Sequence, residues 1–379
     1  MQDLSLQYLS LLSQAQCDDY TAAREGEKKL GQTVGIVNSI EKIATATTHG
    51  YRFALIGIPE TIGPAANHGK QGAQDGWDAF LSYFLNLQSN TFLSGDDILL
   101  LGHIDCDDLH TEVSPGTPLQ TSHLHQLCDQ LDQRVHPILH HVFNAGLIPI
   151  IIGGGHNNAY PIIKACAQVK QQALAVSNLD PHADFRALEG RHSGNPFRYA
   201  HAEGYLERYS VLGLHEQKNS AEALEKLTKL DFPFFSIQQS HWRKEITFAD
   251  CISQTQEYLC AAVSPTLSST PSSTPSSTLS LPTPLPIGVE LDLDVITEMP
   301  TSAITRAGVS LDDALYYVHQ MAALPNVQYL HLAEGAPSRH PAGGIERTEG
   351  QTEGNAAGKR VVGQALAELV CTFIKSAHG

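Results

Sequence analysis

The chain has 379 residues, of which 42% are hydrophobic and 17% are charged, and its formal net charge is −16 at pH 7. This composition supplies enough apolar surface for a sizeable core, so a largely disordered chain is excluded. The acidic balance disfavours nucleic acid as a partner, because phosphate binding needs clustered lysine and arginine. We therefore expect a globular protein that acts on a small molecule.

The cysteines and the amino terminus indicate the cellular compartment. The seven cysteines are odd in number, widely spaced and without a CxxC pair, which indicates reduced thiols. The first twenty residues lack the basic region and the apolar core of a secretory signal. No run of about 18 apolar residues occurs in the sequence. These patterns predict a cytoplasmic protein that does not bind a membrane.

The order of the expected elements predicts the fold. Residues 1–49 are polar, and we expect them to form an N-terminal helical extension with no strand before about residue 51. From residue 50 to 379, apolar strand-like runs begin near residues 52, 97, 147, 173, 209, 287 and 327, and segments of helical length lie at 119–144, 157–171, 218–230, 311–323 and 356–376. Alternation of this kind is typical of βαβ units. It predicts an α/β fold, a single three-layer αβα domain with a mostly parallel central sheet.

A compositionally biased segment interrupts this pattern. Residues 262–286 are rich in serine, threonine and proline, so they cannot form a packed core. We expect a loop insertion between a helix and the strand that carries Asp292. A tolerated surface insertion is the favoured interpretation, and a role in assembly or as a lid is the alternative.

Polar residues follow three of the predicted strands. In open α/β sheets, ligands bind at the carboxyl ends of the strands. The residues are His156 after IIIGGG, Asp180, His182 and Asp184 in DPHAD, and Asp292 and Asp294 in DLD. Side chains two apart on an extended chain point to the same side, so those within each motif can converge. One such residue alone would more often cap a helix or lie in the core. Four carboxylates and two imidazoles together would repel each other unless cations were bound.

These residue types favour particular metals. Carboxylate and imidazole ligands without thiolate favour Mn²⁺, with Fe²⁺, Co²⁺, Ni²⁺ and Zn²⁺ as alternatives. Six protein ligands suit two ions that share bridging carboxylates. Two metals about 3.5–4 Å apart can bind one water and lower its pKa towards neutrality. The sequence therefore predicts a binuclear metal site that presents hydroxide to an electrophilic carbon.

The motifs GGGH (153–156), DPHAD (180–184) and DLD (292–294) resemble, in order and spacing, the metal motifs of the arginase family of ureohydrolases. The resemblance spans roughly residues 51–375 and implies an arginase/deacetylase-like fold with two Mn²⁺ per chain. By this resemblance, one manganese is held by His156, Asp180, Asp184 and Asp292, and the other by Asp180, His182, Asp292 and Asp294. Asp180 and Asp292 would bridge. Gly155 departs from the family, which usually has Asp before the metal-binding histidine, so a carboxylate that tunes this ligand is missing.

The resemblance also implies catalytic and substrate-binding residues. Asp184 and Glu334 would be catalytic, and Glu334 in HLAEGAP would hold the cationic amidino or guanidino group of the substrate. An ordinary exposed glutamate is the alternative for Glu334. His192 aligns loosely with a proton-shuttling histidine of the family, and a structural histidine is an equal alternative.

The loop after DPHAD corresponds to the part of the family that selects the substrate tail. Arg186 stands where arginases have Asn, and it is followed by SGN (193–195), so Arg186, Ser193 and Asn195 are the expected substrate-binding residues. Arginine can clamp a carboxylate with two hydrogen bonds, which favours a dianionic substrate. The DFR and SGNPF segments are also similar to the Asp-Leu-Arg and Ser-Gly-Thr-Pro-Phe pattern of formimidoylglutamases.

We therefore expect hydrolysis of formimidoylglutamate to glutamate and formamide. The first alternative is hydrolysis of a guanidino compound with release of urea, arginine being favoured over agmatine. A single-zinc deacetylase of the same architecture is a more distant alternative, and Asp292, Asp294 and His156 weigh against it. A catalytically silent metal-binding scaffold is the alternative from another class, and a homo-oligomer stays open.

Overall fold

The computed structural model describes residues 6–113, 120–261, 284–341 and 350–377. A ten-stranded sheet forms its centre, in the order β1-β4-β3-β5-β10-β9-β6-β7-β8, with β2 also paired to β4. Its strands are β1 (Leu9–Leu11), β2 (Gly35–Ile36), β3 (Phe53–Gly57), β4 (Ile98–Ile104), β5 (Ile148–Ile152), β6 (Leu174–Leu179), β7 (Leu206–Leu214), β8 (Phe234–Ser236), β9 (Ile287–Asp292) and β10 (Val327–Ala333). The strand pairs of this sheet are parallel except β1 with β4, which is antiparallel.

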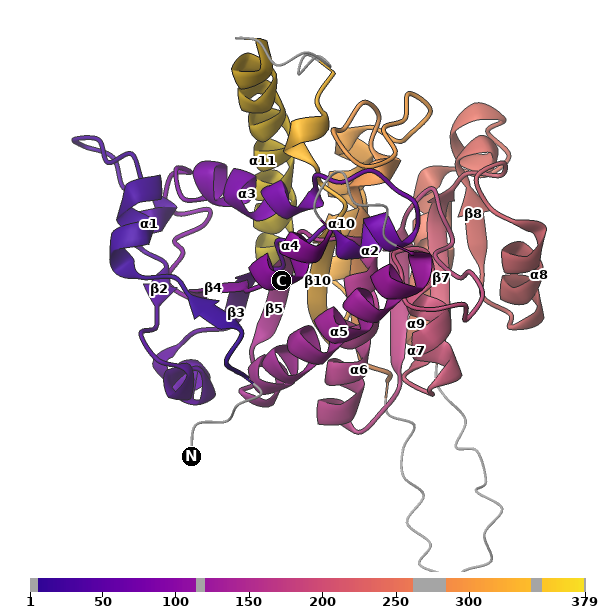
Figure 1. The fold of residues 1–379 in the computed structure, drawn as a ribbon, viewed down its shortest axis with the longest axis horizontal. Helices are drawn as coiled ribbons and strands as arrows, with labels where there is room; N and C mark the ends of the chain where they lie inside the picture. The colour runs from indigo at the N-terminus through magenta and orange to yellow at the C-terminus, as the bar shows by residue number, and fades with distance from the viewer. Residues whose placement is uncertain (1–5, 114–119, 262–283, 342–349, 378–379) are drawn as a thin grey trace, which may run out of the picture.

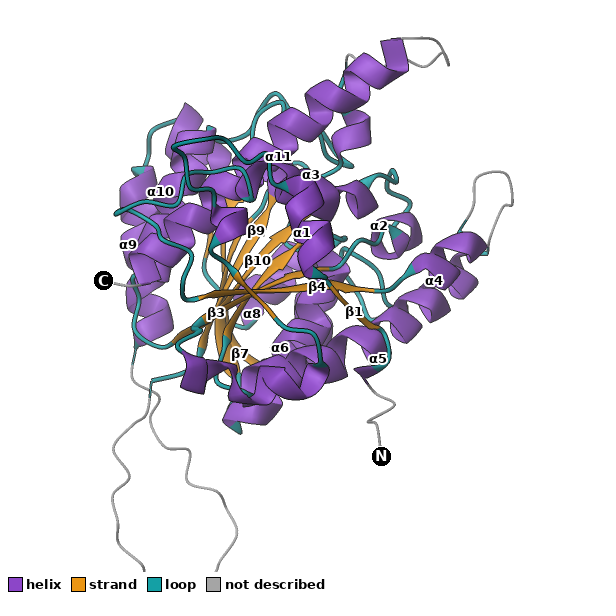
Figure 2. Ribbon diagram, turned by 90° about the vertical axis from the view of Figure 1, so that its left-hand side faces the viewer, coloured by secondary structure: helices purple, strands orange, loops and turns teal. Residues whose placement is uncertain are grey.

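Helices cover both faces of the sheet (Figure 2). They are α1 (Gln14–Tyr20), α2 (Ile62–Ala66), α3 (Gly76–Phe84), α4 (Asp107–Glu112), α5 (Thr121–Asn144), α6 (Ala159–Lys170), α7 (Pro196–Ala202), α8 (Ala221–Lys229), α9 (Phe248–Cys260), α10 (Leu311–Ala322) and α11 (Gly350–Ala377). Two cores result, because successive strand side chains point to opposite faces. Ala54 and Ile56 of β3 pack with α5 and α6, whereas Phe53 and Leu55 pack with α3, α9, α10 and α11.

This arrangement confirms the predicted three-layer αβα fold and its mostly parallel sheet. The central strands β3, β5, β10, β9 and β6 are buried on both faces, which explains why they form continuous apolar runs in the sequence. Segments distant in the sequence lie side by side: α3 packs against α11 (Figure 1).

The prediction of no strand before residue 51 is wrong. β1 and β2 both lie within the expected helical extension and join the sheet at β4. They have three and two residues, too short to show an alternating pattern. The backbone of β1 packs closely against that of β4 at Gly102, which has φ +128°. A Cβ at this position would lie 2.1 Å from the Ser10 carbonyl oxygen, so glycine is needed for the pairing. Most of the predicted insertion, residues 262–283, lies outside the described residues.

The cysteines agree with the sequence-based prediction of free thiols. None of the seven is paired in a disulfide, and only Cys260 is exposed. Among the described residues, no helix combines the length and the apolar character that crossing a membrane requires.

Candidate metal centre

The four central strands β5, β10, β9 and β6 are neighbours in the sheet. Their carboxyl ends therefore meet at one edge, where ligand sites of open α/β sheets form. His156 follows β5, Glu334 follows β10, Asp292 ends β9, and Asp180 follows β6. Residues separated by as many as 178 positions in the chain are thus brought together, and His156 N donates a hydrogen bond to Glu334 Oε1.

The first group of candidate ligands surrounds one nitrogen of His156. His156 Nδ1 lies 2.9 Å from Asp184 Oδ2 and 3.1 Å from Asp180 Oδ2. The third carboxylate oxygen, Asp292 Oδ2, lies 3.5 Å away. His156 Nδ1 is buried, and none of these contacts has hydrogen-bond geometry. One nitrogen faced by three carboxylate oxygens is a suitable ligand set for a divalent cation.

The second group shares residues with the first. Ligand atoms of His182, Asp292 and Asp294 all lie within 4.8 Å of one another. Asp180 connects the two groups, because its Oδ2 faces His156 while its Oδ1 lies 3.4 Å from His182 Nδ1. The structure therefore brings the six residues expected as metal ligands together in two groups that share Asp292. That Asp180 and Asp292 bridge two ions stays a prediction, and it is consistent with the contacts of Asp180 with both histidines and with the place of Asp292 in both groups.

The glycine turn before His156 depends on a glutamate that the sequence analysis missed. Gly154 has φ +71°, a conformation that side chains other than glycine rarely adopt. Glu60 Oε1 accepts hydrogen bonds from Gly155 N at 2.6 Å and from Asn158 Nδ2 at 2.8 Å. A Cβ at Gly155 would lie 2.2 Å from Pro64 Cδ, so the Asp that the family usually has here would not fit. The only sequence signal for Glu60 is its place just after the β3 run.

The electrostatics of the cluster favour bound cations. Burial raises the pKa of Asp292 well above its usual value, and the charges of Asp294 and Asp180 raise it further. Burial, with the charge of Asp180, raises the pKa of Asp184 to about 6. Burial acts to lower the pKa of His182, but contacts with the neighbouring aspartates outweigh it and raise that pKa to about 9. The carboxylates cannot all ionise at low cost without positive charge beside them, so the residues fit divalent metal ions.

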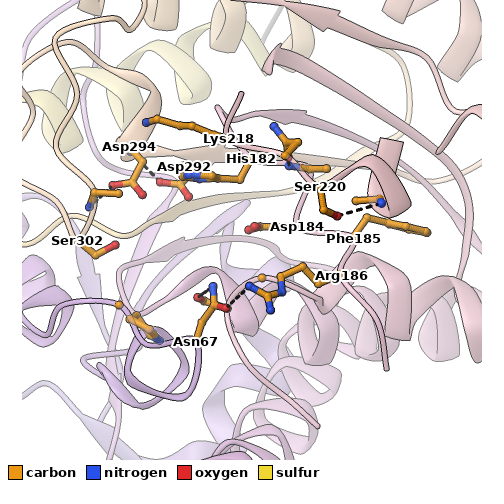
Figure 3. Close-up of a pocket in the computed structure, with 18 of the residues that line it drawn as sticks. Asn67, His182, Asp184, Phe185, Arg186, Lys218, Ser220, Asp292, Asp294 and Ser302 are labelled. Atoms are coloured by element: carbon orange, nitrogen blue, oxygen red, sulfur yellow. Dashed lines mark hydrogen bonds between the residues drawn. The ribbon is translucent and has the colours of Figure 1, made fainter. Parts of the chain in front are cut away.

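A cavity of about 510 Å³ adjoins the candidate ligands (Figure 3). Its lining includes His182, Asp184, Asp292, Asp294 and Glu334. His156 and Asp180 are fully buried and are not among the lining residues. A small molecule in the cavity would therefore contact one side of the cluster.

Glu334 is placed to bind a cation in this cavity. Its backbone has φ +65°, a strained conformation for a residue with a Cβ. Its Oε2 is buried and has no hydrogen-bond partner among the described residues. Burial, followed by the charges of Asp292 and Asp294, raises the pKa of this carboxyl well above its usual value. An unpartnered buried carboxylate of this kind would be stabilised by a cationic ligand.

Two cationic side chains line other parts of the cavity. Arg186 Nη2 lies 3.1 Å from Glu189 Oε1, and Nη1 donates to Asn67 Oδ1 at 3.4 Å. The Arg186 side chain is 54% exposed, so solvent reaches it. Lys218, from the loop between β7 and α8, also lines the cavity (Figure 3). The sequence analysis missed Lys218, although it follows the end of a predicted strand.

Residues 51–266, more than half of the chain, match a family model described as "Arginase family". The chain belongs to the arginase family. It is 30% identical over 166 residues to a formimidoylglutamase from Corynebacterium efficiens, a region covering 44% of this chain and 46% of that relative. It is also 30% identical over 181 residues to a formimidoylglutamase from Ralstonia nicotianae, a region covering 45% of this chain and 49% of that relative. The chain thus spans about half the length of the curated relatives it matches.

Solved structures of this family show the same fold. The crystal structure of formimidoylglutamase from Bacillus subtilis has a TM-score of 0.65 with 18% identity, and 94% of each chain is covered. Trypanosoma cruzi formiminoglutamase with Mn²⁺ has a TM-score of 0.59 with 17% identity, covering 89% of this chain and 99% of that one.

Two expected functional residues of this arginase-family chain do not reach the cavity. His192 is absent from the lining. Its Nδ1 accepts from Gly194 N at 3.0 Å, its Nε2 lies 2.9 Å from Asn195 Nδ2, and its ring centroid lies 5.6 Å from that of His125 of α5. Asn195 Nδ2 also donates to loop carbonyls, and its Oδ1 accepts from Arg191 Nη1 at 2.8 Å. The structure thus places His192 and Asn195 within the loop rather than in the cavity lining, and their roles as proton shuttle and as substrate ligand stay predictions. Ser193 does line the cavity.

The metal-free protein should lose stability as the pH rises. The folded-state pKa values of about 6 for Asp184 and about 9 for His182 lie above the unfolded values of about 3.9 and 6.5. The folded state therefore binds more protons, and stability falls between pH 3.9 and 6 for Asp184 and between pH 6.5 and 9 for His182. Mn²⁺ should reverse the second trend, because metal ligands must be deprotonated. Melting temperatures of chelator-treated and Mn-loaded protein across pH 5 to 9 test this. A metal-free melting temperature that climbs between pH 6.5 and 9 would contradict it.

Proposed function

We propose that this chain is a binuclear manganese hydrolase that cleaves formimidoylglutamate to glutamate and formamide. The observation that carries the proposal is the pair of ligand groups sharing Asp292, beside a cavity lined by Glu334 and two cationic side chains. The relatives named formimidoylglutamase support the substrate, and the Mn²⁺ of the Trypanosoma cruzi structure supports the metal.

The proposed mechanism divides the work between metals and side chains. When bound, the two ions supply Lewis acidity and lower the pKa of a water. Glu334 Oε2 holds the protonated amidino nitrogen, which fixes the formimidoyl carbon beside the cluster. Asp184, which lines the cavity, accepts a proton from the attacking water and returns it to the departing nitrogen. The carbon–nitrogen bond to glutamate then breaks, and formamide leaves.

The tail of the proposed substrate is complementary in charge to the two cationic side chains of the cavity, Arg186 and Lys218. Formimidoylglutamate carries two carboxylates, and Arg186 and Lys218 lie on different loops of the cavity wall. We assign one carboxylate to each of them. Arginine and agmatine carry positive charge on or near the tail, which two cations would disfavour.

A small substrate panel tests the proposed function. Purified Mn-loaded protein should release formamide from formimidoylglutamate faster than urea from arginine or agmatine, and should contain two Mn²⁺ per chain. Faster release of urea would identify a guanidino hydrolase, which Glu334 would serve equally well. One bound zinc with release of acetate would identify a deacetylase. Two bound metals without release of any product would identify a catalytically silent scaffold.

Arg186→Asn and Lys218→Met should each raise KM for formimidoylglutamate. A shielded charge-assisted hydrogen bond contributes about 1.5–3 kcal/mol, but solvent screens an exposed pair, so we expect a roughly three- to ten-fold rise. The kcat should change less, because the tail does not react. Lys229→Met is the matched control, since Lys229 lies outside the cavity lining and is 73% exposed. Unchanged KM in both cavity variants would remove the tail assignment while leaving the metal chemistry intact.

A further inference from the structure

A fourth buried carboxylate lies near His156, on the ring nitrogen that does not face the candidate metal ligands. Glu290 Oε2 lies 3.4 Å from His156 Nε2. Glu290 is on β9, directly across from His331 of β10, and both side chains are completely buried. Neither residue is among the expected metal ligands or substrate-binding residues, and neither lines the cavity.

Two other donors hold the Glu290 carboxylate in place. Tyr329 Oη donates to Oε1 at 2.7 Å, and His331 Nδ1 donates to Oε2 at 2.6 Å. A buried carboxylate is costly unless hydrogen bonds and charges compensate for the lost water. The remaining neighbour is His156 Nε2, which is buried and has no hydrogen-bond partner among the described residues. The carboxylate is therefore fixed by β10 at 3.4 Å from the imidazole nitrogen.

This placement decides which tautomer of His156 is favoured. A neutral imidazole carries one N–H and one lone pair. With the hydrogen on Nε2, the N–H faces Glu290 and the lone pair of Nδ1 faces Asp180 and Asp184, where a cation would bind. The other tautomer would place an N–H among the candidate metal ligands and a lone pair against the Glu290 carboxylate, where the two would repel.

We propose that Glu290 is a positioning residue that holds His156 in the tautomer and orientation that bind a metal. It supplies from β9 the carboxylate that Gly155 cannot provide, since a side chain at Gly155 would collide with Pro64. Carboxylates that hydrogen-bond to a ligating histidine increase its basicity and restrict its rotation. The inference rests on the proposed metal centre, and it adds Glu290 to the residues that determine how tightly that centre binds metal.

Mn²⁺ titration of Glu290→Gln, with a competing chelator and without substrate, tests the inference. Glutamine keeps the size and removes the charge, so we expect the affinity of the His156 position to fall about 10- to 100-fold. The position held by His182 and Asp294 should change less. The electron paramagnetic resonance signal of a coupled Mn²⁺ pair should therefore disappear at concentrations that still saturate the wild type. Tyr329→Phe is the matched control: it removes a hydrogen bond from Oε1 but keeps the charge, so it should leave the metal affinity near that of the wild type.

Each outcome decides the inference. A folded Glu290→Gln variant that binds both ions as tightly as the wild type overturns it and leaves the metal centre standing. Wild-type protein that binds no pair of Mn²⁺ overturns the proposed function and the inference together. Should Glu290→Gln fail to fold, Glu290→Asp replaces it, because aspartate keeps the charge but withdraws it from His156. Weakened metal binding in Glu290→Asp supports the inference, and wild-type binding overturns it.

Discussion

Alanine at Asp180 or at Asp292 should empty both metal positions, whereas alanine at His156 should empty mainly one. The two oxygens of Asp180 face different histidines, and Asp292 belongs to both ligand groups. Losing either carboxylate therefore removes a ligand from each ion. Metal ions provide several kcal/mol of transition-state stabilisation, and each 1.4 kcal/mol is about ten-fold in rate. We expect kcat/KM to fall by about 10³-fold or more in either aspartate variant.

Metal analysis of the purified variants separates these cases. His156→Ala should retain the ion near His182 and Asp294, because these two residues form with Asp292 a candidate ligand group that does not include His156. Asp250→Ala is the control, since Asp250 lies in the first turn of α9 and outside the cavity lining. Two ions per chain with near-normal activity in Asp180→Ala or Asp292→Ala would show that the ligand assignment is wrong.

Glu334→Gln should lower kcat as well as kcat/KM for formimidoylglutamate. Glutamine can still accept the hydrogen bond of His156 N, so the backbone geometry is retained. The lost charge is the one that faces the reacting amidino group, and a hydrogen bond to a charged group contributes about 1.5–3 kcal/mol. The expected loss is therefore roughly 10- to 100-fold. Because the amidino group reacts, this loss should affect kcat, unlike the loss at Arg186.

The measurements that check this are steady-state kinetics and metal content together. Two Mn²⁺ per chain should remain, since Glu334 is not among the candidate ligands. Ser302→Ala changes a neighbouring residue of the cavity lining and should have a much smaller effect. A rise in KM at constant kcat in Glu334→Gln would place this residue at the substrate tail and contradict its assigned role.

The fold and the candidate ligands could be predicted because both depend on local patterns. The apolar runs mark buried parallel strands, and Asp180, His182 and Asp184 converge through the spacing of one motif. Contacts between elements could not be read in this way. Glu290 meets His331 only because of the register between β9 and β10, which the sequence does not reveal.

The loop after Asp184 shows the same limit. Motif spacing placed Asn195 at the substrate, but buried Arg191 bonds to Asp132 of α5 at 2.8 Å and to Asn195 at 2.8 Å. These contacts fold the loop back on the protein, so Ser193 reaches the cavity while Asn195 does not. The short strands β1 and β2 were not predicted because they form by pairing with the edge of β4 that β3 leaves unpaired, and their own sequences carry no strand pattern.

The position of β10 in the sheet has a consequence for folding. This strand is the last of the described strands in the chain, yet it lies between β5 and β9 and pairs with both. During synthesis, β5 and β9 have no correct partner at this position until residues 327–333 leave the ribosome. Unpaired strand edges are prone to non-native pairing and aggregation. A nascent chain stopped before β10 should therefore be insoluble or protease-sensitive and should bind no manganese pair, so the sheet and the candidate site would be completed in the same late step.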